Sequence, residues 1–325
     1  MAGPRFQARF FLALAGVLAF GALTRQMSAM SLLLQGVFTA LVTPFSADGS
    51  SIDFDAYEKL LAQQIDGGVS GLVPCGTTGE SPTLSDAEQR DLVARTVRFA
   101  KGRLPVLVGT GSNNTKKSIE TSKAAFEAGA DGVMIVTPYY NKPSQEGLYR
   151  HVTEIAKAVS GPVVVYNVPG RSIVELSVDT LLRIADTCPN VVGLKDASGN
   201  VFFVQELVNK ARGRLVDLSG DDPLTLPMLA VGAKGVISVT SNLFPRQVGE
   251  VVADALAGKW ADAERKNSRL YPLHRALFSE PSPAPIKAAL AIKGMMQPSV
   301  RLPIVEASQE CKDHLAQVLK TYEAT

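Results

Sequence analysis

At 325 residues and 46% hydrophobic content, the chain is long enough to bury the core of one barrel-sized domain with an appendage. Its 33 basic and 31 acidic residues leave a formal charge of +2, and no Lys/Arg cluster is interleaved with aromatic residues, so nucleic acid is not an expected partner. Cys75, Cys188 and Cys311 are far apart and only three histidines accompany them. We therefore expect reduced thiols, a cytosol-like compartment and no structural zinc.

The first thirty residues differ in kind from the rest. Two arginines precede an apolar run at 10–23, and no acidic residue appears before Asp48. Such a run is shorter than the about 20 residues of a membrane span and suits a signal-peptide core, although a poor cleavage site follows it. The alternatives are an organellar transit peptide and a start assigned too far upstream, with the true start at Met27 or Met30, which we favour. We therefore exclude residues 1–30 from fold reasoning and expect a cytoplasmic protein, or an organellar one if the segment is a transit peptide.

Short apolar runs alternate with amphipathic stretches of helical length from residue 36 onward. The candidate strands, eight in all, are 36–43, 71–75, 105–109, 132–136, 162–167, 191–195, 215–219 and 235–239. The candidate helices between them include 55–65, 86–100, 115–128, 146–159 and 178–185. Several of these helices open on a Ser, Asp or Asn cap. Gly-Ala or Gly-Val pairs just before strands, as in GGVSG, AGADG and VGAKG, indicate helices that end in a left-handed glycine.

Eight strand-helix units predict an α/β fold in which a parallel sheet closes into a (β/α)8 TIM barrel of about 250 residues. An open doubly wound sheet is the competitor, but it would carry a GxGxxG turn after its first strand, and none follows 36–43. Beyond the barrel, further helices are expected at 259–277, 285–295 and 306–322. The expected parts are thus an N-terminal extension at 1–30, a catalytic barrel at 31–257 and a small C-terminal helical region at 258–325.

Polar residues gather where the strands end, which is where barrels of this kind hold their chemistry. The strand ends read TPF at 43–45, GTTGES at 76–81, GTGSNN at 109–114, TPYYN at 137–141, YNVPGR at 166–171, KDASGN at 195–200, SGDD at 219–222 and TSN at 240–242. The strand starts carry mostly Gly, Pro and aliphatic residues. This asymmetry favours an active site at the carboxyl ends of the strands.

Lys195 closes the apolar run VVGLK and is the candidate nucleophile. A lysine amine has a reference pKa near 10.4, so at neutral pH it must be desolvated or lie near another cation in order to attack a carbonyl. Attack on a ketone would give a Schiff base, whose iminium withdraws electrons so that the adjacent carbon loses a proton and becomes an enamine. The structural alternative is that Lys195 only pairs with Asp196 at a sheet edge.

Other strand ends offer the proton donors and carboxylate ligands that this chemistry needs. The hydroxyls that could relay protons are those of Tyr166, Tyr140 and Thr78. Arg171 suits bidentate binding of a carboxylate, and Thr77 with the GTTGE backbone could donate hydrogen bonds to a keto-acid carboxylate. Each residue also has a structural alternative: a tyrosine that caps the core, an ordinary strand-to-helix turn, or an arginine in a surface ion pair. Their convergence at one end of the barrel favours the functional interpretation.

Six segments together resemble the dihydrodipicolinate synthase family of pyruvate-dependent Schiff-base aldolases: GTTGES at 76–81, TPYYNKPSQEGLY at 137–149, YNVPGR at 166–171, LKDASGN at 194–200, SGDD at 219–222 and GVISVTSN at 235–242. The likeness runs from about Gly36 to the C-terminus, with the motifs spaced as in that family. It implies condensation of pyruvate with L-aspartate 4-semialdehyde to 4-hydroxy-tetrahydrodipicolinate with loss of water, in lysine and diaminopimelate biosynthesis. It also implies no metal and no organic cofactor, because the lysine itself acts as the electron sink.

The resemblance implies a role for each site residue. The catalytic residues would be Lys195 as the Schiff-base lysine, Tyr166 as the central proton shuttle, and Thr78 and Tyr140 as the rest of the relay, with Tyr140 reaching into a neighbouring subunit. The substrate-binding residues would be Thr77 and Thr78 for the pyruvate carboxylate, Arg171 for the carboxylate of the semialdehyde, and Gly220 and Ile237 through their main chains. The implied assembly is a homotetramer built as a dimer of dimers, with no membrane partner for the folded domain.

Three related kinds of aldolase share the lysine and much of the GTTGE-like loop: N-acetylneuraminate lyase, the 2-keto-3-deoxy sugar acid aldolases and 4-hydroxy-2-oxoglutarate aldolase. The arginine of YNVPGR together with the TPYYNKPSQEGLY run favours the synthase over these alternatives. A more distant hypothesis is a non-catalytic barrel that serves as a ligand sensor. Loss of Lys195 or Tyr166 would mark such a protein, and both residues are present.

Regulation is where the chain departs from the family. The resemblance implies an allosteric lysine pocket between subunits, and its matching residues are kept at Ser81, Asn113 and Tyr139. The positions that carry histidine, histidine and glutamate in strongly inhibited members are Asp86, Gln89 and Lys117 in this chain. Because Lys117 would repel the amino group of a bound lysine, we expect weak or absent feedback inhibition by L-lysine.

Overall fold

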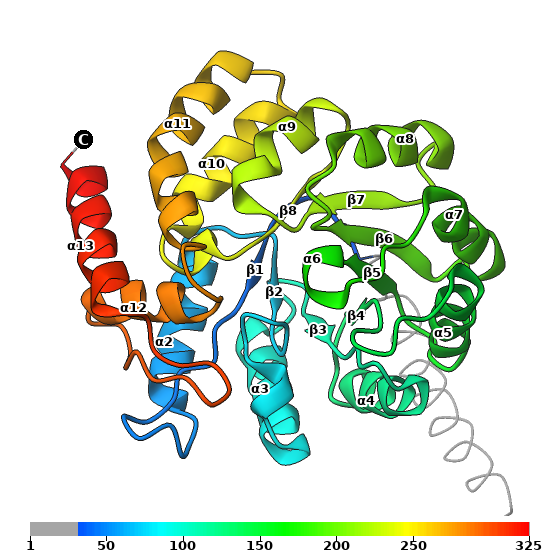
Figure 1. Cartoon of the computed structure of the whole chain (residues 1–325), viewed down its shortest axis with the longest axis horizontal. Helices are drawn as coiled ribbons and strands as arrows, with labels where there is room; N and C mark the ends of the chain where they lie inside the picture. Colours follow the sequence, from blue (N-terminus) through cyan, green and yellow to red (C-terminus); the bar gives the residue numbers. More distant parts are fainter. Residues whose placement is uncertain (1–31, 325) are drawn as a thin grey trace, which may run out of the picture. The chain divides into compact units, whose positions relative to one another are not determined.

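The chain forms a ring of parallel strands with helices packed outside it (Figure 1). The computed structural model describes residues 32–324. Its strands are β1 (Gly36–Ala40), β2 (Gly71–Val73), β3 (Leu107–Gly109), β4 (Gly132–Val136), β5 (Val163–Asn167), β6 (Val191–Asp196), β7 (Val216–Ser219) and β8 (Gly235–Ser238). All eight predicted strands are therefore confirmed. β1 ends earlier than predicted because the backbone N–H of Val42 leaves the ladder and donates to Oδ1 of Asn242 at 3.2 Å.

The strands are hydrogen-bonded in the order β2-β1-β8-β7-β6-β5-β4-β3. The two ends of this order meet, since Leu72 forms a parallel bridge with Val106 and the N–H of Gly109 donates to the carbonyl of Pro74 at 3.0 Å. β1 lies between β2 and β8, its pairs on both sides being parallel. This closed arrangement confirms the (β/α)8 barrel and rules out the open doubly wound sheet.

The helices alternate with the strands as the sequence predicts. They are α2 (Phe54–Asp66), α3 (Asp86–Ala100), α4 (Thr115–Glu127), α5 (Gln145–Lys157), α6 (Pro169–Ser172), α7 (Val178–Thr187), α8 (Val201–Ala211), α9 (Thr225–Ala230), α10 (Pro245–Leu256), α11 (Trp260–Ala276), α12 (Ala284–Ile292) and α13 (Gln309–Glu323). Short 3-10 turns lie at η1 (Ser81–Thr83), η2 (Asp222–Leu224) and η3 (Thr240–Asn242). The elements of the sequence prediction thus appear within a few residues of their expected bounds.

Local signals in the sequence explain where these helices start and stop. The side chains that accept a backbone N–H of the first helical turn are Asp53, Ser85, Asn114, Ser144, Ser177, Asn200 and Ser308. Gly68, Gly129 and Gly232 have φ of 74°, 94° and 113°, so the predicted left-handed glycines between helix and strand are confirmed. These caps and turns direct each helix back to the start of the next strand.

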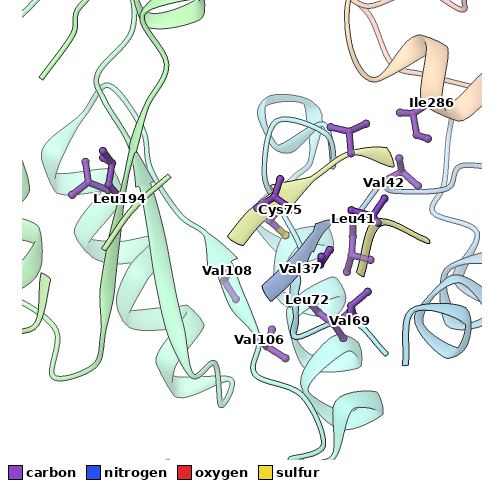
Figure 2. Close-up of a cluster of buried hydrophobic side chains, with 14 of the residues drawn as sticks. Val37, Leu41, Val42, Val69, Leu72, Cys75, Val106, Val108, Leu194 and Ile286 are labelled. Atoms are coloured by element: carbon purple, nitrogen blue, oxygen red, sulfur yellow. The ribbon is translucent and has the colours of Figure 1, made fainter. Parts of the chain in front are cut away.

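A continuous aliphatic core joins the strands to the helices around them (Figure 2). Val37, Leu72, Val106, Val108 and Leu194 belong to it, and each is at most 2% exposed. Burial of an aliphatic side chain contributes about 1.5–3 kcal/mol, so this layer makes the barrel a rigid frame for residues at the strand ends.

The last helices, α11, α12 and α13, lie beyond the barrel's final helix α10. α11 packs against α10, and α13 packs against both α11 and α12 (Figure 1). Ile286 of α12 belongs to the same hydrophobic cluster as Leu41 and Val42, which follow β1 (Figure 2). From Leu34 onward the chain is one compact unit, so the division at 257/258, in the turn between α10 and α11, remains a prediction.

The targeting hypothesis for residues 1–30 lies outside the described residues. Within residues 32–324, none of the helices combines the length and the apolar character that a membrane crossing requires.

Candidate active site

Lys195 lies near the carboxyl end of β6, beside the tyrosine of the neighbouring strand. It is in register with Tyr166 of β5, and its Nζ lies 4.2 Å from the centroid of the Tyr166 ring. Lys195 is only 6% exposed. The adjacent Asp196 is engaged elsewhere, since its carboxylate accepts from Asn167 Nδ2 at 3.2 Å and from Ser198 Oγ at 2.8 Å. The contacts therefore favour a lysine that faces Tyr166 over one that serves as an edge partner for Asp196.

The surroundings of Lys195 disfavour its charged form. Burial lowers the pKa of Lys195 to about 8; the nearby Arg171 lowers it too, and the Asp222 carboxylate opposes both. At pH 7 about 9% of such an amine is neutral, against about 0.03% for a solvated lysine. The structure thus supplies the desolvation and the second cation that a nucleophilic lysine needs.

Tyr166 is buried beneath the amine and keeps its proton. Burial raises the pKa of Tyr166 to about 12, while Arg171 and a hydrogen bond with the Thr77 side chain act in the opposite direction. The hydroxyl next to Tyr166 is therefore that of Thr77, and the relay role expected of Thr78 remains a prediction. Thr78 is buried and follows directly in the same loop. Tyr166 therefore lies between Thr77, which hydrogen-bonds to it, and Lys195, whose amine lies over its ring; we call these three residues the row.

The loop that carries both threonines is fixed by its own backbone and by β1. Gly79 N–H donates to the carbonyl of Gly76 at 3.1 Å, and Glu80 N–H donates to the carbonyl of Thr77 at 3.0 Å. Thr43, just after β1, donates its hydroxyl to the carbonyl of Gly79 at 2.7 Å. The cap of the following helix α3 is Ser85, so the GTTGES segment is a separate loop and not the cap of that helix.

Gly220 follows β7 and makes room for the lysine. Its N–H donates to the carbonyl of Asp196 at 2.6 Å, and a Cβ at this position would lie 3.1 Å from Lys195 Cε and 2.9 Å from Ala197 Cβ. A side chain here would push against the nucleophile. Ile237, in β8, is buried and in register with Phe38. The expected main-chain contacts of Gly220 and Ile237 with a substrate remain predictions.

Asp222, the last residue of the SGDD motif, belongs to the site although the sequence predicted no role for it. Its carboxylate accepts from Ser238 Oγ at 2.5 Å and from the N–H groups of Val239 and Thr240 at 2.8 and 3.1 Å. These donors fix a buried negative charge close enough to raise the pKa of Lys195. The pair of acidic residues directly after β7 was the sequence feature that could have indicated this role. The groups that hydrogen-bond to Asp222, however, come from β8 and the turn that follows it.

A cleft of about 410 Å³ reaches the row at Thr77, whereas Lys195 and Tyr166 are not part of its lining. Thr77 and Arg171, both expected to bind substrate, line it together with Ser81 and Tyr139, both expected in a lysine pocket. Lys117 also lines it. Residues with two different expected roles therefore border one continuous space.

Two contacts at the edge of this cleft bear on the regulatory prediction. Lys117 Nζ lies 2.8 Å from both carboxylate oxygens of Asp86, which ties α4 to α3. Asn113 donates its Nδ2 to the carbonyl of Tyr139 at 3.2 Å. The Asp86 carboxylate at this edge is therefore already paired with the ammonium group of Lys117.

Tyr140 is exposed to solvent on its own chain. Its side chain is 86% exposed, and its φ of 74° is a left-handed conformation that is rare outside glycine. A tyrosine held in the open in this way is available to a second subunit. Among the residues that the structure describes, no group of three or more His, Cys, Asp or Glu side chains is placed to hold a metal ion.

Comparisons with known proteins agree with this geometry. Residues 33–322 match the dihydrodipicolinate synthetase family. The chain is 57% identical over 291 residues to the 4-hydroxy-tetrahydrodipicolinate synthase of Sorangium cellulosum, covering 90% of this chain and 97% of that relative.

Solved structures give the same result. The 4-hydroxy-tetrahydrodipicolinate synthase of Methylacidiphilum fumariolicum SolV is 44% identical with a TM-score of 0.88, covering 90% of this chain and 97% of that one. The dihydrodipicolinate synthase of Aquifex aeolicus is 42% identical with a TM-score of 0.87, covering 89% and 98%. The likeness spans the barrel and the C-terminal helices alike, and the chain therefore belongs to the dihydrodipicolinate synthetase family.

Proposed function

We propose that the protein is a lyase with 4-hydroxy-tetrahydrodipicolinate synthase activity, which condenses pyruvate with L-aspartate 4-semialdehyde in lysine and diaminopimelate biosynthesis. The observation that carries the proposal is a buried Lys195 amine with a pKa lowered to about 8, 4.2 Å from the ring of Tyr166. Relatives that match nearly the whole barrel and the C-terminal helices carry that name. A sensor barrel would have no need of a lysine prepared in this way.

The reaction begins with the neutral amine of Lys195. It attacks the keto carbon of pyruvate, and the carbonyl oxygen leaves as water to give an iminium. Loss of a methyl proton turns the iminium into an enamine, whose terminal carbon forms the new bond to the aldehyde carbon of the semialdehyde. The amino group of the second substrate then displaces Lys195 from the iminium and closes the ring. One water is released in total, and the lysine is regenerated.

Proton transfers in this sequence fall to the hydroxyls beside the amine. Tyr166 stays protonated at neutral pH because burial raises its pKa to about 12, so it can protonate the leaving oxygen before it accepts a proton. Its hydrogen bond with Thr77 supports a part for that residue in the relay, and Thr78 keeps the relay role that the family resemblance implies. General acid-base catalysis of this kind contributes about 10²–10⁴-fold to a rate.

Substrate binding is assigned to five residues, of which Thr77 and Arg171 line the cleft. Thr77 and Thr78 hold the pyruvate carboxylate through hydroxyl and backbone donors, and Arg171 holds the carboxylate of the semialdehyde. Gly220 and Ile237 contribute main-chain contacts. The placement of Thr77 and Arg171 in the lining of the cleft supports these assignments.

Tyr140 belongs to the relay of a neighbouring subunit in this proposal, and the assembly is a homotetramer made of two dimers. Its high exposure and left-handed backbone support a contact outside its own chain. Mixing subunits tests it: Tyr140→Ala and Lys195→Ala chains are each expected to be inactive, and co-refolding the two should restore part of the activity. Failure of the mixture to regain activity, with mixed assemblies demonstrated by mass spectrometry, would contradict a shared site.

Another pyruvate aldolase of the same superfamily is the competing activity. The decisive experiment incubates the protein with pyruvate and borohydride, locates the adduct by mass spectrometry, and compares turnover with the semialdehyde against cleavage of N-acetylneuraminate. We expect the adduct on Lys195, none in Lys195→Ala, and turnover with the semialdehyde. An adduct on another lysine would refute the site, and faster cleavage of N-acetylneuraminate would refute the substrate.

We also place the protein in the cytoplasm. Cys75, Cys188 and Cys311 are buried and free, which suits a reducing compartment. Fractionation of cells followed by detection of the protein tests this location.

A further inference from the structure

A buried ion pair joins the GTTGES loop to the C-terminal helices. Lys287 of α12 donates from Nζ to Glu80 Oε1 at 2.7 Å, and the two side chains are 0% and 2% exposed. The partners are 207 positions apart in the sequence. Glu80 is the fifth residue of GTTGES, so the pair ties the active-site loop to an element outside the barrel ring.

The second oxygen of the same carboxylate is held by another part of the C-terminal region. The backbone N–H of Arg301 donates to Glu80 Oε2 at 2.9 Å. The Arg301 guanidinium in turn donates to both carboxylate oxygens of Glu88 in α3, at 3.0 and 2.7 Å. Both cations also lie over the ring of Phe45, with Lys287 at 4.1 Å and Arg301 at 4.3 Å. Glu80 is thus clamped from two directions.

The clamp acts at a strained point of the chain. Glu80 has a φ of 55°, and Cys75, just before the loop, has a φ of 56°. Left-handed backbone at residues other than glycine persists where surrounding contacts enforce it. Glu80 also donates its N–H to the carbonyl of Thr77, so the position of Glu80 is transmitted directly to the residue whose side chain meets Tyr166.

We propose that Glu80, Lys287 and Arg301 form a positioning device for the active site, in which the C-terminal region holds the Thr77 hydroxyl at Tyr166. This inference rests on the proposed function, because it assigns to the clamp the geometry of the proton relay. None of the three residues touches a reacting atom. The C-terminal helical region is then a working part of the site.

Stability alone does not account for this arrangement. Taking a carboxylate and an ammonium out of water is so unfavourable that a buried ion pair is often no more stabilising than well-packed apolar residues of similar volume. Burial also lowers the pKa of Lys287 to about 8, against the opposing effect of Glu80. The Lys287–Glu80 pair is better explained by the way its hydrogen bonds fix the position of Glu80 than by its net contribution to the stability of the fold.

The test compares a double variant, Glu80→Gln with Lys287→Met, with the parent protein. Glu80→Gln alone leaves the Lys287 charge unpaired in the core and is expected to fold poorly, whereas the double variant removes both charges and keeps the volume filled. A matched control is Lys266→Met, which breaks ion pairs of α11 with Asp254 and Glu250 far from the loop. Four quantities are measured: thermal midpoint, borohydride-trapped pyruvate, exchange of pyruvate methyl protons in D₂O, and kcat with KM for the condensation.

We expect the double variant to keep a thermal midpoint close to that of the parent and to trap pyruvate on Lys195 at saturation. Methyl-proton exchange and kcat/KM for pyruvate should both fall by at least about tenfold, which is part of the about 10²–10⁴-fold that a well-placed proton-transfer group contributes. The Lys266→Met control should change neither rate. A double variant that exchanges and turns over within twofold of the parent would overturn the clamp. Absence of a Lys195 adduct in the parent itself would instead overturn the proposed function.

Discussion

Replacement of Lys195 by methionine is expected to abolish the pyruvate adduct and to stabilise the folded protein. The lysine is 6% exposed, and burial lowers its pKa to about 8. Its ammonium form is therefore less favourable in the fold than in the unfolded chain. Methionine fills a similar volume without a charge, so the substitution removes a destabilising charge together with the nucleophile.

The size of this effect follows from the pKa. A lysine whose pKa falls from 10.5 to about 8 on folding destabilises the fold by roughly 3 kcal/mol when it is charged in both states. Since the folded pKa is the lower one, the penalty is complete below pH 8 and fades as the pH rises from 8 to 10.5. We therefore expect Lys195→Met to raise the free energy of unfolding by about 1–3 kcal/mol at pH 7 and by less than half of that at pH 9.5.

Urea unfolding at both pH values, at one protein concentration, measures this gain. The control is Lys116→Met, because the Lys116 side chain is 85% exposed and should change stability by less than about 0.5 kcal/mol. A variant that is less stable than the parent at pH 7, or whose gain is the same at pH 9.5, would show that the amine is not desolvated. The account of Lys195 as a nucleophile prepared by burial would then fail.

Four further outcomes are expected. Adduct formation should rise tenfold per pH unit up to about pH 8, where Lys195 loses its proton, and then level off; a flat profile would contradict the lowered pKa. Gly220→Ala should slow borohydride trapping and destabilise the fold by about 1–3 kcal/mol, because its Cβ would lie 3.1 Å from Lys195 Cε. Tyr166→Phe should keep the adduct and lose about 10²–10⁴-fold in turnover, whereas unchanged turnover would remove Tyr166 from the relay. Millimolar L-lysine should inhibit weakly or not at all because Lys117, a cation paired with Asp86, lies at this edge; strong inhibition would refute this.

The fold could be predicted from the sequence because its signals are local. A parallel strand buried on both faces is a continuous apolar run, and VVVYN and VVGLK appear in the structure as β5 and β6. Helix caps such as Ser85 and Asn114 act within three residues of themselves. Where the prediction was least accurate, as at the end of β1, a contact from Asn242, 200 positions away, decides the backbone.

The site could be predicted only in part, since its details depend on contacts between distant segments. Lys195 and Tyr166 could be selected as candidates because each lies at the end of an apolar run. The choice between Thr77 and Thr78 depends on the direction of two adjacent side chains in a loop, which no pattern of residue types encodes. Asp222 acts through donors that lie 16 to 18 positions further on, in a different strand and turn.

Several features that are unfavourable for folding lie at one end of the barrel. Cys75, Glu80, Tyr140 and Ile173 follow β2, β4 and β5 with φ between 55° and 74°, conformations that cost roughly 1–3 kcal/mol each outside glycine. The buried Lys195 adds a charge penalty at the same end. Local strand and helix signals cannot enforce such geometry, so it has to be held by contacts from elsewhere. The clamp from α12 and Arg301 onto Glu80 supplies one of them, and through the clamp that we propose the region beyond the barrel takes part in holding the site at its mouth.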